Sequence, residues 1–163
     1  MQHKFETLAV HAGIEPEALT GAVMTPIFQT STYAQSSPGE HKGYEYSRTD
    51  NPTRTVLQTQ LAALEGAEAA VATASGMAAI LSTCMALLKA GDHVVCSRDV
   101  FGTTVNLFSK YLAKFGVEIT FVALLDLAAW RSAVRPNTAM LFLETPSNPL
   151  CEIADLAVMS RLA

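Results

Sequence analysis

The chain has 163 residues, of which half are apolar and 16% are charged, and its formal net charge is −4. This composition is typical of a globular domain with one substantial core, and it excludes a disordered or coiled-coil chain. Lysine and arginine are nowhere concentrated, which argues against a nucleic-acid partner. The longest nearly apolar stretch, residues 77–88, is too short to span a bilayer, and the first residues lack the apolar core of a signal peptide. We therefore expect a cytoplasmic protein without membrane contact.

The cysteines and histidines do not have the spacing of metal ligands. The cysteines show no C-x-x-C pattern and lie in apolar surroundings, so we expect all three to be buried small side chains: Cys84, Cys96 and Cys151. The histidines occur singly, which predicts solvated or locally hydrogen-bonded side chains: His3, His11, His41 and His93.

Residues 1–50 contain many turn-forming residues and little regular hydrophobic periodicity, which predicts an extended arm. An arm of this length without its own apolar period is not expected to fold alone. We expect it to lie either on the body of its own subunit or, as we favour, on a neighbouring subunit.

The first clear helix is predicted after Asn51, which suits an N-cap, with Pro52 at the first helical position. Gly66 is placed to end this helix. Apolar residues recur along it at i, i+4 and i+7, namely Leu57, Leu61 and Leu64.

Strands and helices then alternate to the end of the chain. The predicted strands are 69–74, 93–97, 117–122 and 138–143. The predicted helices are 77–89, with Lys89 in the last turn and Gly91 as the stop, 103–115, with Val105, Phe108, Leu112 and Phe115 on one face, and 127–134. This alternation predicts an α/β fold with a mainly parallel sheet covered by helices on both faces.

Ligands in such sheets bind beyond the carboxyl ends of the strands, where three loops are expected: 75–77, 99–102 and 144–149. In the first loop, Ser75-Gly76-Met77 opens a helix whose end has free N–H groups and partial positive charge, so it can hold a phosphate. Serine at this corner is also a common helix cap without any ligand. The residues of this turn alone leave both readings open.

The last residues begin another helix, with Asp155 as its N-cap and an apolar face that starts at Leu156, Met159 and Leu162. The chain stops at Ala163 without a helix-ending residue. We therefore expect this sequence to be the front portion of a longer protein.

Four stretches together resemble the Cys/Met metabolism pyridoxal-phosphate enzymes, which include cystathionine synthases and lyases, methionine γ-lyase and homoserine sulfhydrylases. The stretches are TPIFQTSTY at 25–33, YEYSRTDNPTR at 44–54, ASGMAA at 74–79 and ETPSNP at 144–149. They occur in the family's order and spacing, and the resemblance covers essentially the whole chain.

The resemblance implies which residues contact the cofactor phosphate. The amides of the Ser75-Gly76-Met77 turn would bind it, and Tyr46 and Arg48 would reach it from the neighbouring subunit. A guanidinium fork and a phenol hydroxyl suit a phosphate dianion. Without the resemblance, Arg48 would be interpreted as a solvated loop residue and Tyr46 as a packing residue.

Two further positions follow from the resemblance. Asn148 would lie near the ring hydroxyl of the cofactor, with a turn residue before Pro149 as the equally plain alternative. Most relatives place a tyrosine at the position of Phe101, stacked on the pyridine ring and able to move protons. Phenylalanine keeps the stacking and loses the hydroxyl, and its segment VFGTTVNLF looks most like that of O-succinylhomoserine sulfhydrylases.

The family fold is the large domain of fold-type I (aspartate aminotransferase-like) enzymes, so we expect an arm at 1–50 and an incomplete cofactor-binding domain at 51–163. Relatives are tetramers built from dimers. Their Schiff-base lysine lies downstream of the Ser-Asn-Pro turn, beyond Ala163 here, so the isolated chain is expected to be inactive.

The implied function is γ-replacement on an O-acylhomoserine, a small amino-acid substrate that reacts with sulfide to give homocysteine in methionine biosynthesis by trans-sulfuration chemistry. A cystathionine γ-synthase or γ-lyase of the same family is the first alternative. The second is a non-catalytic short chain that acts as an assembly module with complete subunits.

Overall fold

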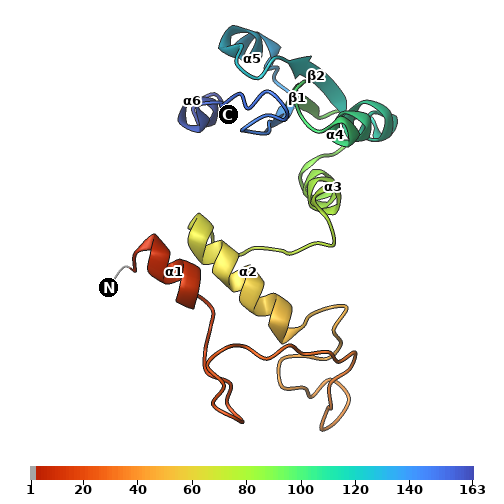
Figure 1. The fold of residues 1–163 in the computed structure, drawn as a ribbon. Coiled ribbons are helices and arrows are strands. Elements are labelled where there is room, and N and C mark those ends of the chain that lie inside the picture. The colour runs from red at the N-terminus through yellow and green to blue at the C-terminus, as the bar shows by residue number, and fades with distance from the viewer. Residues whose placement is uncertain (1–2) are drawn as a thin grey trace. The chain divides into compact units, whose positions relative to one another are not determined.

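The computed structural model describes residues 3–163, and the chain divides into two compact units, Met1–Ala72 and Thr73–Ala163. Figure 1 shows the elements of each unit along the chain. Within residues 3–163, every helix is too short or too polar to cross a bilayer. The predicted boundary between an arm at 1–50 and a domain from residue 51 stays a prediction.

The first unit contains two helices, α1 (Phe5–His11) and α2 (Pro52–Glu65), which lie side by side (Figure 1). The predicted signals of α2 are confirmed. The Asn51 side chain accepts a hydrogen bond from the Thr53 N–H, Pro52 is the first helical residue, and Gly66 ends the helix with a left-handed backbone at φ 64°. Only glycine adopts that conformation without strain, which explains the residue at this position.

The arm has more structure than its sequence predicts. Helix α1 occupies Phe5–His11, where no regular element is expected, and the Gln60 amide of α2 donates to the carbonyl of Ala9 at 2.6 Å. Further along, residues 30–33 pair antiparallel with residues 45–47 through an isolated bridge between Thr32 and Tyr46. These contacts join residues far apart in sequence, so local periodicity does not reveal them.

The second unit is an α/β fold. Its strands are β1 (His93–Ser97), β2 (Glu118–Val122) and β3 (Thr138–Phe142), and its helical elements are α3 (Gly76–Leu87), α4 (Gly102–Asn106), the π-helix η1 (Leu107–Tyr111), the 3-10 helix η2 (Leu112–Phe115), α5 (Leu127–Ala133) and α6 (Leu156–Ser160). The strand order is β2-β1-β3, and both pairings are parallel. The predicted parallel sheet is confirmed.

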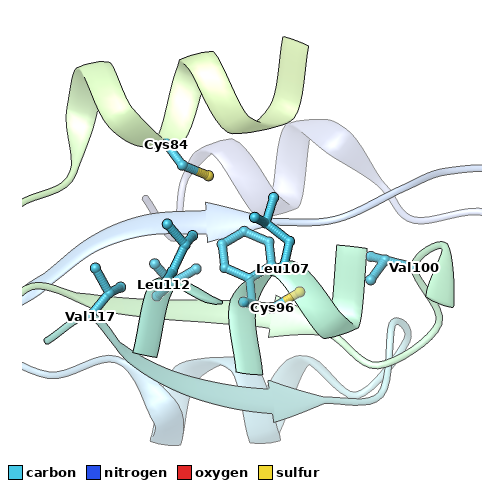
Figure 2. Close-up of a cluster of buried hydrophobic side chains, with 8 residues drawn as sticks. Cys84, Cys96, Val100, Leu107, Leu112 and Val117 are labelled. Atoms are coloured by element: carbon cyan, nitrogen blue, oxygen red, sulfur yellow. The ribbon is translucent and has the colours of Figure 1, made fainter. Parts of the chain in front are cut away.

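Successive side chains of β1 point to opposite faces of the sheet, and each face has its own apolar cluster. Val94 and Cys96 pack on one face with Cys84 of α3 and with Leu107, Phe108 and Leu112. Figure 2 shows Cys96 in this cluster together with Cys84, Leu107 and Leu112. Val95 packs on the other face with Trp130 of α5 and Met159 of α6. Every residue of β1 is buried, as expected for a central strand covered on both sides.

The predicted strand at residues 69–74 is wrong. These residues have no regular structure, and Val71 is 82% exposed. A strand requires a neighbour that completes its hydrogen-bond ladder, and none of the strands within residues 3–163 pairs with this segment. Apolar composition alone therefore does not make it a strand.

Two predicted helices differ in detail. Helix α3 ends at Leu87, so Lys89 lies beyond its last turn and donates its N–H to Asp92 at 2.9 Å, while Gly91 belongs to the turn that follows. The helix predicted over 103–115 is α4 followed by η1 and η2. Because η1 is wider and η2 tighter than an α-helix, side chains leave the 3.6-residue period, and Phe115 is 71% exposed instead of buried.

The burial of the cysteines and of His93 tests the predictions made for these side chains. Cys84 and Cys96 are buried as predicted, but Cys151 is exposed, because it lies in the loop after β3 with a left-handed backbone at φ 54°. His93 is fully buried and its ring nitrogens contact Thr138 Oγ1 at 2.8 Å and Thr120 Oγ1 at 2.9 Å. These partners lie 45 and 27 residues away in the sequence, so His93 is bonded across the sheet and not, as predicted, to solvent or to residues near it.

Candidate functional site

The loops after β1 and β3 meet at the carboxyl edge of the sheet. The backbone N–H of Phe101 donates to Oε2 of Glu144 at 3.0 Å, although 43 residues separate the two in sequence. Phe101 is the N-cap of α4 and its side chain is 61% exposed. A large apolar ring held by its backbone and open to solvent is available to stack on a planar ligand.

The turn before α3 leaves its first amides free. Ser75 Oγ accepts from the Ala78 N–H at 3.1 Å, whereas the N–H groups of Gly76 and Met77 make no hydrogen bond within residues 3–163. A Cβ placed on Gly76 would meet no atom within 4 Å, and the residue is not at positive φ. The fold itself therefore does not require glycine here, but a ligand that approaches the backbone closely would.

The side chain of Met77 links this turn to the neighbouring loop. Thr104 is buried in α4, and its hydroxyl donates to the Met77 sulfur at 3.7 Å. The Thr104 N–H in turn donates to the carbonyl of Phe101 at 2.8 Å. The start of α3 and the Phe101 loop are thus fixed relative to each other by packing and hydrogen bonds in one unit.

The loop at 144–149 is organised around Ser147, which is buried. Its N–H donates to the carbonyl of Glu152 at 2.9 Å, and its hydroxyl accepts from the Glu152 N–H at 3.1 Å. Asn148 is exposed, and its amide makes no hydrogen bond within the described part of the chain. The side chain therefore does not close the turn itself and remains available to a ligand.

Tyr46 and Arg48 lie together in the first unit. The Arg48 guanidinium donates to the Tyr46 hydroxyl at 2.6 Å, and its central carbon lies 5.0 Å from the centre of the tyrosine ring. Arg48 is exposed and Tyr46 is half-buried. The pair thus places an exposed positive charge beside a phenol hydroxyl, a combination that suits a phosphate.

Two of the three thiols are enclosed in the core. Burial, with help from the nearby Glu144 carboxylate and Cys84, raises the pKa of the Cys96 thiol to about 12, and burial also raises the pKa of Cys84. Both thiols therefore stay protonated at neutral pH. The five lysines are all exposed: Lys4, Lys42, Lys89, Lys110 and Lys114.

Sequence reasoning missed the partners that hold the predicted site residues. Glu144 opens the ETPSNP stretch, and its position after an apolar strand was the one available signal that it faces the site. Its bond to Phe101 could not be inferred, because it depends on the parallel pairing of β1 with β3.

The fold and these loops together define an α/β protein with free amides at the start of α3 and an exposed aromatic ring in the loop after β1. Residues 6–163 match the family model described as "Cys/Met metabolism PLP-dependent enzyme". The chain belongs to this family, whose members depend on pyridoxal phosphate.

Known relatives cover several activities. The chain is 53% identical over its whole length to a "Probable cystathionine gamma-synthase" of Herpetosiphon aurantiacus, and covers 51% of that protein. It is 48% identical over 98% of its length to an O-succinylhomoserine sulfhydrylase of Pseudomonas aeruginosa, and covers 41% of it. A solved cystathionine gamma-lyase from Lactobacillus plantarum, complexed with L-serine, matches 99% of the chain with TM-score 0.89 and 44% identity, and the chain covers 42% of that structure. The chain thus spans about half the length of the relatives it matches, or less.

The residues present fit pyridoxal phosphate. The free amides at the start of α3 and the open space beside Gly76 suit a phosphate, and the exposed Phe101 ring at the same sheet edge suits a pyridine ring. The predicted cofactor is therefore consistent with the chemistry of the groups at this edge.

Proposed function

We propose that this chain provides part of the cofactor site of an enzyme that replaces the γ-substituent of an O-acylhomoserine with sulfur. O-succinylhomoserine is the proposed substrate and sulfide the proposed sulfur donor, with homocysteine as the product, as in methionine biosynthesis. The 48% identity to an O-succinylhomoserine sulfhydrylase supports this assignment. The enzyme is proposed to be a cytoplasmic homotetramer built from dimers.

The observation that carries the proposal is the exposed Phe101 ring beside the Ser75-Gly76-Met77 turn. Phenylalanine can stack on a pyridine ring but has no hydroxyl to exchange a proton. Proton transfer at the substrate must then use another group. Stacking by Phe101 and proton transfer by another group agree with the resemblance of the VFGTTVNLF segment to that of sulfhydrylases.

Bound pyridoxal phosphate would supply an electron sink for the carbanion at the substrate α-carbon. The chain's own groups would bind and orient it. Gly76 and Met77 would donate amides to the phosphate, Tyr46 and Arg48 of a neighbouring subunit would complete the phosphate contacts, and Phe101 would cover the ring. Asn148 would contact the ring hydroxyl.

The catalytic lysine is proposed to lie beyond Ala163. All five lysines of the chain are exposed, whereas a lysine that forms a Schiff base is activated by a desolvating pocket or a neighbouring cationic group. Borohydride reduction of the 163-residue chain with pyridoxal phosphate, followed by peptide mass analysis, should give no stoichiometric adduct at any single lysine. A full adduct at one lysine would refute this part of the proposal.

Cystathionine γ-synthase is the second candidate, because the chain is 53% identical to a probable enzyme of that name. The two reactions give different products from the same activated homoserine. The complete gene product should be incubated with O-succinylhomoserine and either sulfide or cysteine, and the amino acids analysed by mass spectrometry. Homocysteine formed faster from sulfide supports the first candidate, whereas faster formation of cystathionine supports the second.

A lyase is distinguished by the same product analysis when the protein is incubated with cystathionine alone. Release of a keto acid and ammonia from cystathionine, without γ-replacement, would overturn both candidates. The variant Phe101→Tyr adds the hydroxyl that most relatives have at this position. It tests directly whether Phe101 only stacks on the cofactor. If Phe101 only stacks, the variant should keep cofactor affinity while the pH dependence of turnover changes.

A further inference from the structure

We propose that Asn51 is a positioning residue that fixes the Tyr46–Arg48 segment for phosphate binding, in addition to capping α2. This inference rests on the proposed function, because it assigns Asn51 a part in holding the groups proposed to bind the cofactor phosphate. Asn51 is half-buried, and every polar atom of its carboxamide makes a hydrogen bond.

The Asn51 carboxamide joins three segments of the first unit. Oδ1 accepts from the N–H of Thr53 at 2.9 Å, which caps α2. Nδ2 donates to the carbonyl of Phe28 at 3.0 Å and to Ser47 Oγ at 3.0 Å. The orientation of the amide follows from its partners, because a backbone N–H requires an acceptor and a carbonyl requires a donor.

Ser47 is the residue between Tyr46 and Arg48, so its position sets theirs. Its N–H donates to the carbonyl of Ser31 at 2.9 Å, and its hydroxyl donates to the carbonyl of Thr30. The Asn51 amide supplies the proton that the Ser47 oxygen accepts. The Ser47 hydroxyl thus connects the first turn of α2 to the segment that carries Arg48.

The rest of the segment is a turn in which no residue is fully buried. The carbonyl of Tyr46 accepts from the N–H groups of Thr49 and Asp50, both at 3.0 Å, and Arg48 at the top of the turn is exposed. Because no core holds this turn, its orientation depends on its hydrogen bonds. The bonds of Asn51 and Ser47 connect Tyr46 and Arg48 to the start of a 14-residue helix. Arg54 and Thr55 of the same helix hold the other end of the turn, through the carbonyl of Thr49 and the carboxylate of Asp50.

The two roles of Asn51 can be separated by substitution. Serine caps a helix about as well as asparagine, because its oxygen also accepts from a backbone N–H. Serine is too short and too poor in donors to replace the two Nδ2 bonds. Asn51→Ser therefore keeps the cap without adding charge and removes the bonds to Phe28 and Ser47.

The test uses the complete gene product and two probes, pyridoxal phosphate and pyridoxal, which lacks the phosphate. Asn51→Ser should weaken the affinity for pyridoxal phosphate about tenfold, on the scale of one lost charge-assisted contact. The affinity for pyridoxal should stay unchanged. Ser47→Ala leaves the cap untouched and should also weaken the affinity for pyridoxal phosphate but not for pyridoxal. It takes the place of Asn51→Ser if that variant folds poorly.

Asn137→Ser is the matched control, because the Asn137 amide also donates to a backbone carbonyl, that of Gly91 at 2.9 Å, in the other unit. It should leave both affinities unchanged. The decisive comparison is a double variant with Arg48→Ala, in which Asn51→Ser should cause no further loss for pyridoxal phosphate.

The outcomes separate this inference from the proposed function. If Arg48→Ala itself leaves the affinity for pyridoxal phosphate unchanged, the proposed phosphate contact fails. If Arg48→Ala weakens it but neither Asn51→Ser nor Ser47→Ala does, only the positioning role is overturned. Equal loss for pyridoxal and pyridoxal phosphate would also overturn it, because a general structural effect does not distinguish the phosphate.

Discussion

Within residues 3–72 the only buried side chain is that of Ala62, whereas the unit from Thr73 to Ala163 encloses two apolar clusters on the two faces of its sheet. The leucines of α2 illustrate the contrast. Leu57 is 47% and Leu61 43% exposed although their spacing is that of a buried face. The first unit is instead connected by side-chain to backbone hydrogen bonds around Asn51 and Ser47.

This difference indicates where each unit is vulnerable. Removing apolar volume should destabilise the second unit strongly, because burial is the main favourable contribution to its folding. The first unit should respond less to such changes and more to the loss of hydrogen bonds that set its loops.

The largest effect is expected from Trp130→Ala. Trp130 is fully buried, and its indole N–H donates to the carbonyls of Ala123 and Leu124 at 3.1 and 3.2 Å. The cavity and lost packing should lower the free energy of unfolding by about 3–5 kcal/mol. Leu61→Ala in the first unit should cost less than about 1 kcal/mol. Urea denaturation of the complete gene product measures both, and equal losses would break the comparison.

Gly76→Ala should separate binding from stability in the second unit. The new methyl group meets no protein atom within 4 Å, and alanine is favoured over glycine in a helix by up to about 1 kcal/mol, so stability should be unchanged or slightly higher. Affinity for pyridoxal phosphate should fall about tenfold if the phosphate approaches this backbone, equivalent to about 1.4 kcal/mol. Calorimetry with pyridoxal as the control ligand would detect this, and an unchanged phosphate affinity would remove Gly76 from the site.

Acidification should weaken the second unit through His93. Burial, together with the nearby positive charge of Arg135 and against the smaller opposite effect of Glu118, lowers the pKa of His93 below its ordinary value. The unfolded chain then binds a proton that the folded chain does not. Stability is fully present above about pH 6.5 and falls as the pH drops toward the lowered pKa, by at most about 1.4 kcal/mol per pH unit.

Denaturation of the complete gene product at several pH values measures this slope, with His93→Gln as the variant that cannot titrate. The slope between about pH 6.5 and 5 should be smaller in the variant. Identical slopes in both proteins would show that the loss of stability arises from other groups.

The smallest effect is kinetic and concerns the three thiols. Cys151 is exposed, while Cys84 and Cys96 are buried with raised pKa values, so an aromatic disulfide reagent should modify Cys151 first in the folded protein. The other two should react only on unfolding. Cys151→Ser should abolish the fast phase, and a fast phase that persists would show that the core of the second unit opens readily.

Much of the fold could be predicted because its signals are local. The cap at Asn51, the proline after it and the glycine at residue 66 act within one or two turns, and they marked α2 correctly. Asp155 likewise caps α6, and its side chain accepts from the Val158 N–H at 3.0 Å. Strand β1 was predicted with its observed ends, because a central strand buried on both faces is a short continuous apolar run.

The candidate site was predicted only as a set of residues. Tyr46, Arg48, Phe101 and Asn148 were selected by resemblance to the family, and their contacts with the cofactor stay predictions. Their supports were not visible, because the bond of Phe101 to Glu144 spans 43 residues and that of Asn51 to Phe28 spans 23. No local periodicity encodes such a pairing.

The sequence by itself determined the family, the helix caps and the parallel alternation of strands and helices, since these depend on neighbouring residues and on motifs. The tertiary structure decided that residues 69–74 form no strand, that Phe115 and Cys151 are exposed, and that one carboxamide joins three segments. Those outcomes depend on which distant groups are available to pair with or cover a residue. Burial and hydrogen-bond satisfaction are properties of the folded chain, and they were settled only there.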